Sequence, residues 1–430
     1  MHTAFDAHHP PSQALLDQCV HCGFCLSTCP TYVLWGREMD SPRGRIYLMQ
    51  LARDGAVEMS SEWVRPFDTC LGCMACMPAC PSGVDYGKLI EATRGQIARR
   101  YVRPWAETMY RRLLFGTLTR PSRLRLMRWP MLAYQRIGAQ ALVRRLRLTA
   151  LLPKSLQALE ALMPTLKKPE PTRPVTPPVG PRRKRVGLLL GCVQREFLSH
   201  VNAATSRVLA AEGYEVVAPP EQPCCGALMT HAGEEAGAFA FARRMIDVFD
   251  AADVEVVVIN AAGCGSAMKE YGYLLRDDPG YAERAKRFSA KCKDVTEFLA
   301  GIESRAARHP LPLRVAYHDA CHLQHAQGVR AQPRALLSGI PGLELAEIPE
   351  AAICCGSAGI YNLVQPATAS TLGDRKAQFI APLNADVVAT GNPGCLLQIQ
   401  SALARTGQHT PVVHTVQLLD ASIRGVRPEF

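Results

Sequence analysis

Short apolar runs alternate with helical stretches along the C-terminal half of the chain. VGLLLGC (186–192) predicts a strand, residues 197–213 predict a helix closed by a glycine cap, and YEVVAP (214–219) predicts a second strand. The same order returns in LRVAYHDAC (313–321), a helical stretch near 330–338 and LELAEIP (343–349). This alternation predicts βαβ units, arranged as two α/β repeats of about 120 residues each.

The first hundred residues follow helical rather than alternating spacing. Two apolar sets recur at helical intervals: Ile46, Leu48, Met49 and Ala52, and then Tyr86, Leu89, Ile90 and Ile97. No apolar run approaches the roughly 20 residues that a membrane-spanning helix needs. Residues 1–12 are polar and lack the apolar core of an export signal. We therefore predict a helical N-terminal domain in a cytoplasmic protein, with peripheral contact to the cytoplasmic face of the inner membrane as an alternative that stays open.

The cysteines supply the first chemistry. Eight of the 17 lie within residues 19–80, and residues 19–30 and 70–81 both read C-x2-C-x2-C-x3-C-P. This spacing is typical of bacterial ferredoxins, in which the fourth Cys of a run binds the other cluster. We assign one [4Fe–4S] cluster to Cys19, Cys22, Cys25 and Cys80, and a second to Cys29, Cys70, Cys73 and Cys76. The alternative is a pair of zinc sites, although zinc ribbons use paired C-x2-C knuckles without the fourth Cys-Pro.

The other nine cysteines follow the α/β repeat. In the first copy 31 residues separate Cys192 from the Cys-Cys-Gly triplet at 224–226, and in the second copy 32 separate Cys321 from the triplet at 354–356. A further Cys follows each triplet after 37 and 38 residues, and Cys292 is left over. We regard eight of these as candidates for an additional cluster or redox-active thiols: Cys192, Cys224, Cys225 and Cys264, with Cys321, Cys354, Cys355 and Cys395. Packing as small hydrophobic side chains is the competing interpretation.

Three histidines near Cys321, at positions 318, 322 and 325, are further candidate ligands. A lone histidine is more often a structural residue. Cys321 has a counterpart in the first repeat, but none of the three histidines has one. No residue of the chain is assigned a catalytic role.

The charge is concentrated in the middle of the chain. The sequence holds 49 Lys and Arg against 38 Asp and Glu, a net charge of +11. Residues 99–186 alone contribute 21 basic and three acidic residues, so the rest of the chain is net acidic. Large apolar residues between 101 and 152 accompany the arginines, which predicts basic amphipathic helices that dock on a partner or lie on anionic lipid. The chain shows no nucleic-acid motif beside this charge, and its Pro-rich stretch 167–185 predicts a surface linker.

Two ferredoxin runs followed by two CCG repeats resemble the iron–sulfur subunit family of glycolate oxidase, anaerobic glycerol-3-phosphate dehydrogenase and heterodisulfide reductase. Four segments are most similar to the glycolate oxidase branch: CVHCGFCLSTCPTY (19–32), SPRGRIYLM (41–49), CPSGVDYG (80–87) and HDACHLQHAQG (318–328). The resemblance implies two [4Fe–4S] clusters in a subunit of a glycolate dehydrogenase complex. This subunit would pass electrons from flavin on partner subunits, which oxidise glycolate to glyoxylate, to a quinone or another acceptor that is not oxygen. A glycerol-3-phosphate or lactate system and a heterodisulfide-type thiol–disulfide enzyme are the alternatives.

One departure from that family concerns the repeats. Repeats of the heterodisulfide reductase type that hold a noncubane cluster end in C-x2-C, whereas Cys264 and Cys395 here stand alone. No G-x-G-x-x-G follows a predicted strand, so we expect no flavin or nicotinamide in this chain and no substrate site.

The predicted fold class is therefore α+β and multidomain. We expect a helical two-cluster ferredoxin domain (1–100), a basic helical segment with its linker (101–185), and two α/β CCG domains (186–305 and 306–430).

Overall fold

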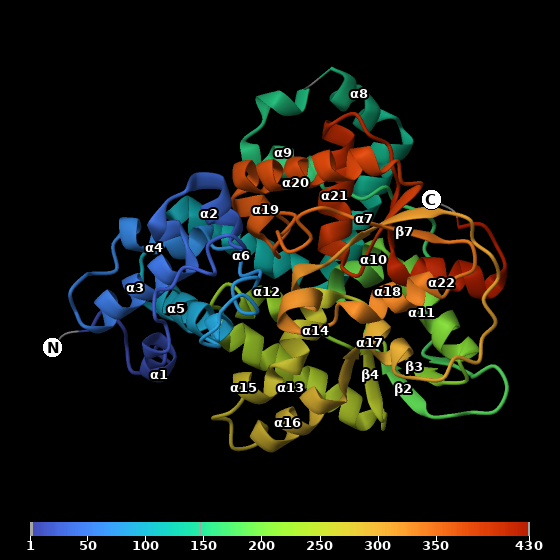
Figure 1. Cartoon of the computed structure of the whole chain (residues 1–430), viewed down its shortest axis with the longest axis horizontal. Helices are drawn as coiled ribbons and strands as arrows, with labels where there is room; N and C mark the ends of the chain where they lie inside the picture. The colour runs from blue at the N-terminus through green and yellow to red at the C-terminus, as the bar shows by residue number, and fades with distance from the viewer. Residues whose placement is uncertain (1–2, 147, 429–430) are drawn as a thin grey trace.

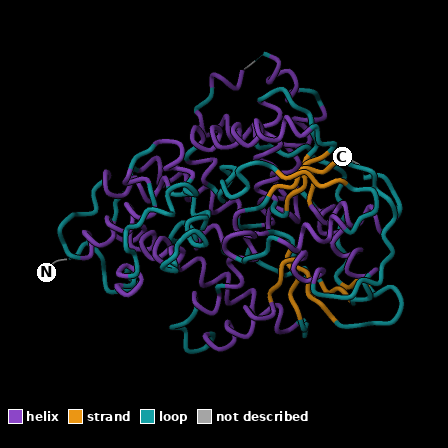
Figure 2. The backbone as a smooth tube through the Cα atoms, in the orientation of Figure 1, coloured by secondary structure: helices purple, strands orange, loops and turns teal. Residues whose placement is uncertain are grey.

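The computed structural model describes residues 3–146 and 148–428. A helical N-terminal part lies at one side of the molecule, and the two α/β repeats lie beside it with their sheets one above the other in the view of Figures 1 and 2. The predicted fold class is confirmed. No helix within the described ranges is both long and apolar enough to cross a bilayer.

The N-terminal part is built of helices, and no strand occurs among its described residues up to position 100. Its elements are α1 (Gln13–Asp17), α2 (Pro30–Trp35), the short 3-10 helix η1 (Glu38–Asp40), α3 (Pro42–Arg53), α4 (Ser61–Thr69) and α5 (Tyr86–Arg100). Ser41 caps α3 by accepting from the Gly44 amide, and Asp85 caps α5 by accepting from the Lys88 amide, each satisfying a free N–H at a helix start. The predicted apolar faces of α3 and α5 meet in one core that includes Met49 and Leu89.

The basic segment is also helical, as predicted. It comprises α6 (Trp105–Leu118), α7 (Pro121–Arg136), α8 (Ala139–Arg145), the 3-10 helix η2 (Leu148–Leu151) and α9 (Lys154–Ala161). Helix α6 runs from the N-terminal part towards the repeats, and α8 and α9 lie at the outer edge near α20 (Figure 1).

The first repeat contains β1 (Val175–Thr176), β2 (Arg185–Leu188), α10 (Cys192–Phe197), α11 (Ser199–Ala211), β3 (Glu215–Val217), α12 (Ala227–Thr230), α13 (Glu235–Ala251), β4 (Val256–Ile259), α14 (Ala262–Lys269), α15 (Tyr271–Leu274), α16 (Ala282–Lys291), β5 (Cys292–Asp294) and α17 (Val295–Ala300). Its sheet has the order β1-β3-β2-β4-β5, and every neighbouring pair except β1 with β3 is parallel. The Pro-rich stretch forms no helix, but Val175 pairs with Val217, so this predicted surface linker supplies an edge strand.

The second repeat contains β6 (Arg314–His318), the π-helical turn η3 (His322–Ala326), α18 (Ala331–Ser338), β7 (Glu344–Glu347), α19 (Tyr361–Val364), α20 (Pro366–Ile380), the 3-10 helix η4 (Ala381–Leu383), β8 (Val387–Thr390), α21 (Pro393–Arg405), β9 (Val412–His414) and α22 (Thr415–Arg424). Its parallel sheet has the order β7-β6-β8-β9, which matches β3-β2-β4-β5 of the first repeat. The predicted duplication is therefore present in the topology.

The two repeats share one hydrophobic core. Val201 of α11 and Val416 of α22 belong to the same buried cluster, together with strand residues of both sheets. Arg207 of α11 donates to both carboxylate oxygens of Asp420 on α22, at 2.7–3.1 Å. The shared core and this ion pair fix the two repeats to each other.

Candidate iron–sulfur centres

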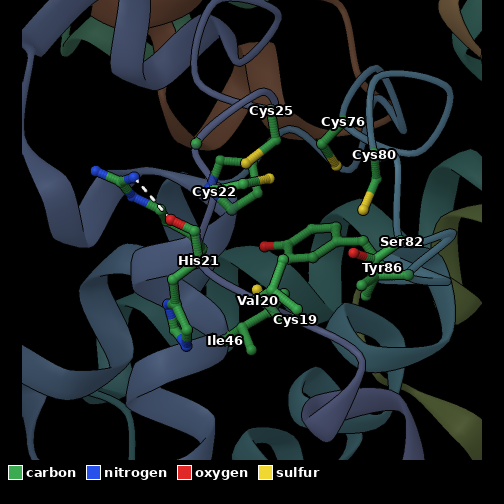
Figure 3. A pocket seen from close by; sticks show the side chains of 14 residues that line it. Cys19, Val20, His21, Cys22, Cys25, Ile46, Cys76, Cys80, Ser82 and Tyr86 are labelled. Atoms are coloured by element: carbon green, nitrogen blue, oxygen red, sulfur yellow. Dashed lines mark hydrogen bonds between the residues drawn. The ribbon is translucent and has the colours of Figure 1, made fainter.

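The first cavity lies at the surface of the N-terminal part. Cys19, Cys22 and Cys25 line it from the first cysteine run, and Cys80 closes it from the second (Figure 3). The loop turns tightly because His21 and Gly23 both adopt positive φ, 54° and 87°. Arg43 of α3 donates to the His21 carbonyl at 3.1 Å and so ties this loop to the helix behind it.

The second cavity adjoins the first. Cys29 lines it from the first run, with Cys70, Cys73 and Cys76 from the second. All four side chains are buried, whereas Cys22 of the first set is exposed. Each predicted set of four cysteines thus surrounds one cavity, and both cavities are bordered by Cys76 and Tyr86.

A buried cation accompanies the second cavity. Arg45 of α3 is 1% exposed and points its guanidinium at Cys29, with Nη1 3.9 Å from Sγ. It donates to the Pro66 carbonyl at 2.6 Å and to Thr31 Oγ1 at 3.0 Å. Burial raises the pKa of the Cys70 thiol, but the cations of Arg45 and Arg94, together with hydrogen bonds from the Gly72 amide and Tyr86, leave that pKa below its ordinary value. At Cys70 this environment favours the anionic thiolate that an iron–sulfur cluster binds.

Burial opposes the ionisation of several other thiols of these two sets. Burial raises the pKa of Cys25 to about 11, and it raises the pKa values of Cys73 and Cys76 well above the ordinary range. Metal binding to these groups must therefore release protons. The donor sets and their surroundings fit a [4Fe–4S] cluster in each cavity. The role of the eight cysteines as its ligands stays a prediction.

The second repeat packs against the wall of the second cavity. Tyr361 of α19 donates to the Thr69 carbonyl at 3.1 Å, and His322 Nε2 lies 2.9 Å from the Gly72 carbonyl. Cys73 packs in the same small core as Cys354. Cys354 of the second repeat therefore packs against the wall of the second cavity, whereas Cys355 belongs to the core of the second repeat itself.

In each repeat the four candidate thiols come together in a row. Hydrogen-bond contacts link Cys192, Cys224, Cys225 and Cys264 in sequence, and the same contacts link Cys321, Cys354, Cys355 and Cys395. The Sγ atoms of Cys321 and Cys354 are 3.9 Å apart. The remaining Cys292 lies apart from both rows, at the start of β5, and donates to the Phe288 carbonyl at 3.4 Å.

The three histidines have different positions. His322 and His325 each contact a backbone carbonyl, of Gly72 and of Ala352 at 2.9 and 3.0 Å. His318 instead lies beside the thiols of Cys355 and Cys395. Our sequence reasoning missed Arg45 and Tyr86 as neighbours of the cavities. The signal for Arg45 was a charged residue on the otherwise apolar inner face of α3.

Comparison with known proteins gives a consistent assignment along the chain. Residues 15–84 match a 4Fe-4S dicluster domain, residues 186–269 and 315–400 match a cysteine-rich domain, and residues 106–163 match the linker region of the glycolate oxidase iron-sulfur subunit. The first match confirms two [4Fe–4S] clusters over the zinc alternative.

Two relatives span almost the whole sequence. A probable glycolate oxidase iron-sulfur subunit of Bacillus subtilis (strain 168) is 40% identical over 93% of this chain and 92% of its own. The chain belongs to the glycolate oxidase iron-sulfur subunit family. The glycolate oxidase iron-sulfur subunit of Escherichia coli (strain K12) is 34% identical over 96% of this chain and 95% of its own. Like these family members, the chain is an iron–sulfur, electron-transferring subunit of an oxidoreductase complex.

A solved structure shares the fold. A hypothetical protein from Helicobacter pylori superimposes with a TM-score of 0.55 over 96% of this chain and 73% of that chain, at 10% sequence identity. At this identity the likeness concerns the arrangement of elements only.

Proposed function

We propose that this chain carries electrons from flavin on partner subunits, which oxidise glycolate to glyoxylate, to a quinone or another acceptor that is not oxygen. The glycolate oxidase relatives support the substrate. The observation that carries the electron-transfer role is the pair of adjacent cysteine-lined cavities that share Cys76 and Tyr86. Bound [4Fe–4S] clusters supply one-electron transfer there.

The cysteines of the two cavities differ in their exposure, and this difference supports a position for the flavoprotein partner. Val20 and Phe24, on the loop that lines the first cavity, are 68% and 66% exposed. The four cysteines of the second cavity are all buried, and the second repeat packs against its wall. We therefore place the flavoprotein partner on the loop of residues 19–25, where an apolar contact brings it nearest to the chain's exposed centre.

The basic helices supply a second surface. Trp105, Met109 and Leu113 recur at intervals of four along α6 and are 78%, 44% and 65% exposed, so one apolar stripe of this helix faces outward. On α7, Trp129 is 71% exposed among arginines. Exposed tryptophan together with arginine is typical of helices that lie on anionic lipid. We propose that α6 and α7 hold the complex peripherally on the membrane that contains the quinone.

The ligand assignment is tested by cysteine replacement. Anaerobically purified wild-type protein should contain about eight irons per chain. In electron paramagnetic resonance spectra of the reduced protein, Cys80→Ser should alter the same signal as Cys22→Ser, and Cys29→Ser should alter the other signal together with Cys73→Ser. If Cys80→Ser instead groups with Cys73→Ser, each run holds its own cluster and the crossed assignment is wrong.

The physiological role is tested in cells. Deleting the chain should abolish glycolate-dependent reduction of a quinone analogue by membranes, and wild-type protein should restore it. If reduction persists after deletion, the chain is not part of that electron path. Loss with lactate or glycerol 3-phosphate instead of glycolate would assign one of the alternative complexes.

A further inference from the structure

A second kind of metal-binding group lies inside the second repeat. His318 ends β6, Cys355 belongs to the CCG loop, and Cys395 lies in the first turn of α21. One ligand atom from each of these three residues lies within 4.8 Å of the other two. The three residues are only 1–3% exposed.

The histidine in this group lacks any other explanation among the described residues. Neither Nδ1 nor Nε2 of His318 has a hydrogen-bond partner, although both are buried. A buried polar atom without a partner costs about 1–3 kcal/mol, so native proteins rarely leave one. A bond to a metal ion would give one of the two ring nitrogens a partner.

The chemistry of the donors selects the ion. One imidazole and two thiolates suit Zn²⁺, which takes such N and S ligands at tetrahedral sites, with the fourth position left to a ligand outside this group of three residues. The two thiolate charges cancel the charge of the ion, so the whole group is neutral. A neutral site is what an interior without water tolerates.

The first repeat provides a comparison within the same chain. His318 stands three residues before Cys321, and Leu189 stands three residues before Cys192. Leu189 is fully buried, and Cys225 and Cys264 occupy the places of Cys355 and Cys395. The thiols are thus duplicated, but the imidazole occurs only in the second repeat.

We infer that the second repeat binds one zinc ion through His318, Cys355 and Cys395, and that the first repeat does not. The ion ties together the end of β6, the CCG loop and α21. Cys354, the neighbour of Cys355, packs beside Cys73. The zinc therefore stabilises the CCG loop that packs against the wall of the second cavity. This role does not depend on the proposed substrate or acceptor.

Metal analysis of the full chain tests this inference. Anaerobically purified wild-type protein should contain about one zinc beside about eight irons. His318→Leu, which copies the first repeat, should lose the zinc and keep the iron, and His318→Cys should keep both. Cys225→Ser in the first repeat is the matched control and should keep the zinc.

Cobalt supplies a readout that does not depend on a variant folding. Wild-type protein freed of zinc should take up one Co²⁺ and show the absorption of tetrahedral cobalt bound to thiolate. Wild-type protein that holds no zinc and takes up no cobalt would overturn the inference. So would iron clearly above eight per chain that falls in His318→Leu, because the group would then belong to an additional cluster.

Discussion

At the scale of single residues, the charge of Arg45 is the feature that acts most directly on the centres. It is buried beside Cys29 and is hydrogen-bonded to Thr31 and Pro66. A positive charge about 6 Å from a centre that gains an electron, at an effective dielectric constant of about 20, stabilises the reduced form by about 3 kcal/mol. For one electron this corresponds to roughly 100 mV.

Replacing this cation should therefore lower one reduction potential. We expect Arg45→Met to shift the potential of the cluster beside Cys29 downward by roughly 100 mV, and Arg45→Lys to shift it much less. Potentiometric titration followed by electron paramagnetic resonance measures the shift. Arg43→Gln is the control, because Arg43 is partly exposed and paired with Glu38. An equal shift in both variants would contradict a specific effect of burial.

A second residue makes stability depend on pH. Asp294 caps α17, and burial raises its pKa to about 6 from an ordinary value near 3.8. The folded protein thus binds a proton more readily than the unfolded chain, so this group's contribution to stability falls as the pH rises from about 4 to 6 and stays unfavourable above that range. Asp294→Asn keeps an oxygen that accepts from Thr296 and removes the charge.

We expect Asp294→Asn to stabilise the protein by about 3 kcal/mol at pH 8 and by about half of that at pH 5. Chemical denaturation of wild-type and variant protein at the two pH values gives the difference in the free energy of unfolding. A larger gain at pH 5 than at pH 8 would refute the assignment of the pH dependence to this carboxyl.

At the scale of elements, close backbone packing joins α5 to the first repeat. Gly233 has φ of +82°, and a Cβ built on it would lie 2.2 Å from the Arg94 carbonyl oxygen. Arg94 in turn donates to the carbonyls of His231 at 2.8 Å and Phe67 at 3.0 Å. The N-terminal part is thus held on the first repeat by a contact that has no room for a methyl group.

Gly233→Ala should therefore push α5 away from the first repeat and destabilise the protein by more than the roughly 1 kcal/mol that a positive φ costs any alanine. Gly36→Ala is the matched control, since Gly36 has φ of +62° and no atom lies within 4 Å of the point that a Cβ would occupy there. Thermal unfolding and limited proteolysis between residues 100 and 105 compare the two. Equal losses would show that the close contact contributes nothing.

The exposed stripe on α6 gives a prediction about lipid. The double replacement Trp105→Ser with Leu113→Ser should reduce co-sedimentation with anionic vesicles by about tenfold or more, because each large side chain contributes about 1 kcal/mol or more at an apolar boundary. Binding should also weaken as salt rises. Val179→Ser, which removes an apolar side chain that is 66% exposed in the linker, is the control. If the double variant binds vesicles as well as wild-type protein does, the stripe on α6 does not contact lipid, and a protein partner is the remaining explanation.

At the scale of the whole molecule, local patterns predicted the elements but not how they meet. The strand–helix alternation located both sheets, and α17 begins directly after β5 because Asp294 supplies its cap. The packing of Cys73 beside Cys354 joins residues far apart in sequence across two surfaces, and no local periodicity encodes such a contact. The strand β1 was missed because it has only two residues and lies among prolines.

The different burial of the two cysteine sets predicts an order of oxidative damage. During exposure to air, the resonance signal that Cys22→Ser removes should decay before the signal that Cys73→Ser removes, because Cys22 is exposed and Cys73 is buried under the second repeat. Spectra taken at intervals measure both rates. The reverse order would mean that the second repeat does not shield its neighbour.

Each predicted set of four cysteines draws on both cysteine runs, and this has a consequence for when the clusters can be inserted. Cys80 closes the first cavity, and three of the four thiols of the second cavity come after residue 69. A nascent chain that has emerged only through Cys29 carries three of the four predicted thiols of the first centre and one of the four of the second, so neither predicted ligand set is complete at that stage. On the crossed assignment, both cavities are completed only once Cys76 and Cys80 have been synthesised, so we expect the two clusters to be inserted together and late rather than one at a time.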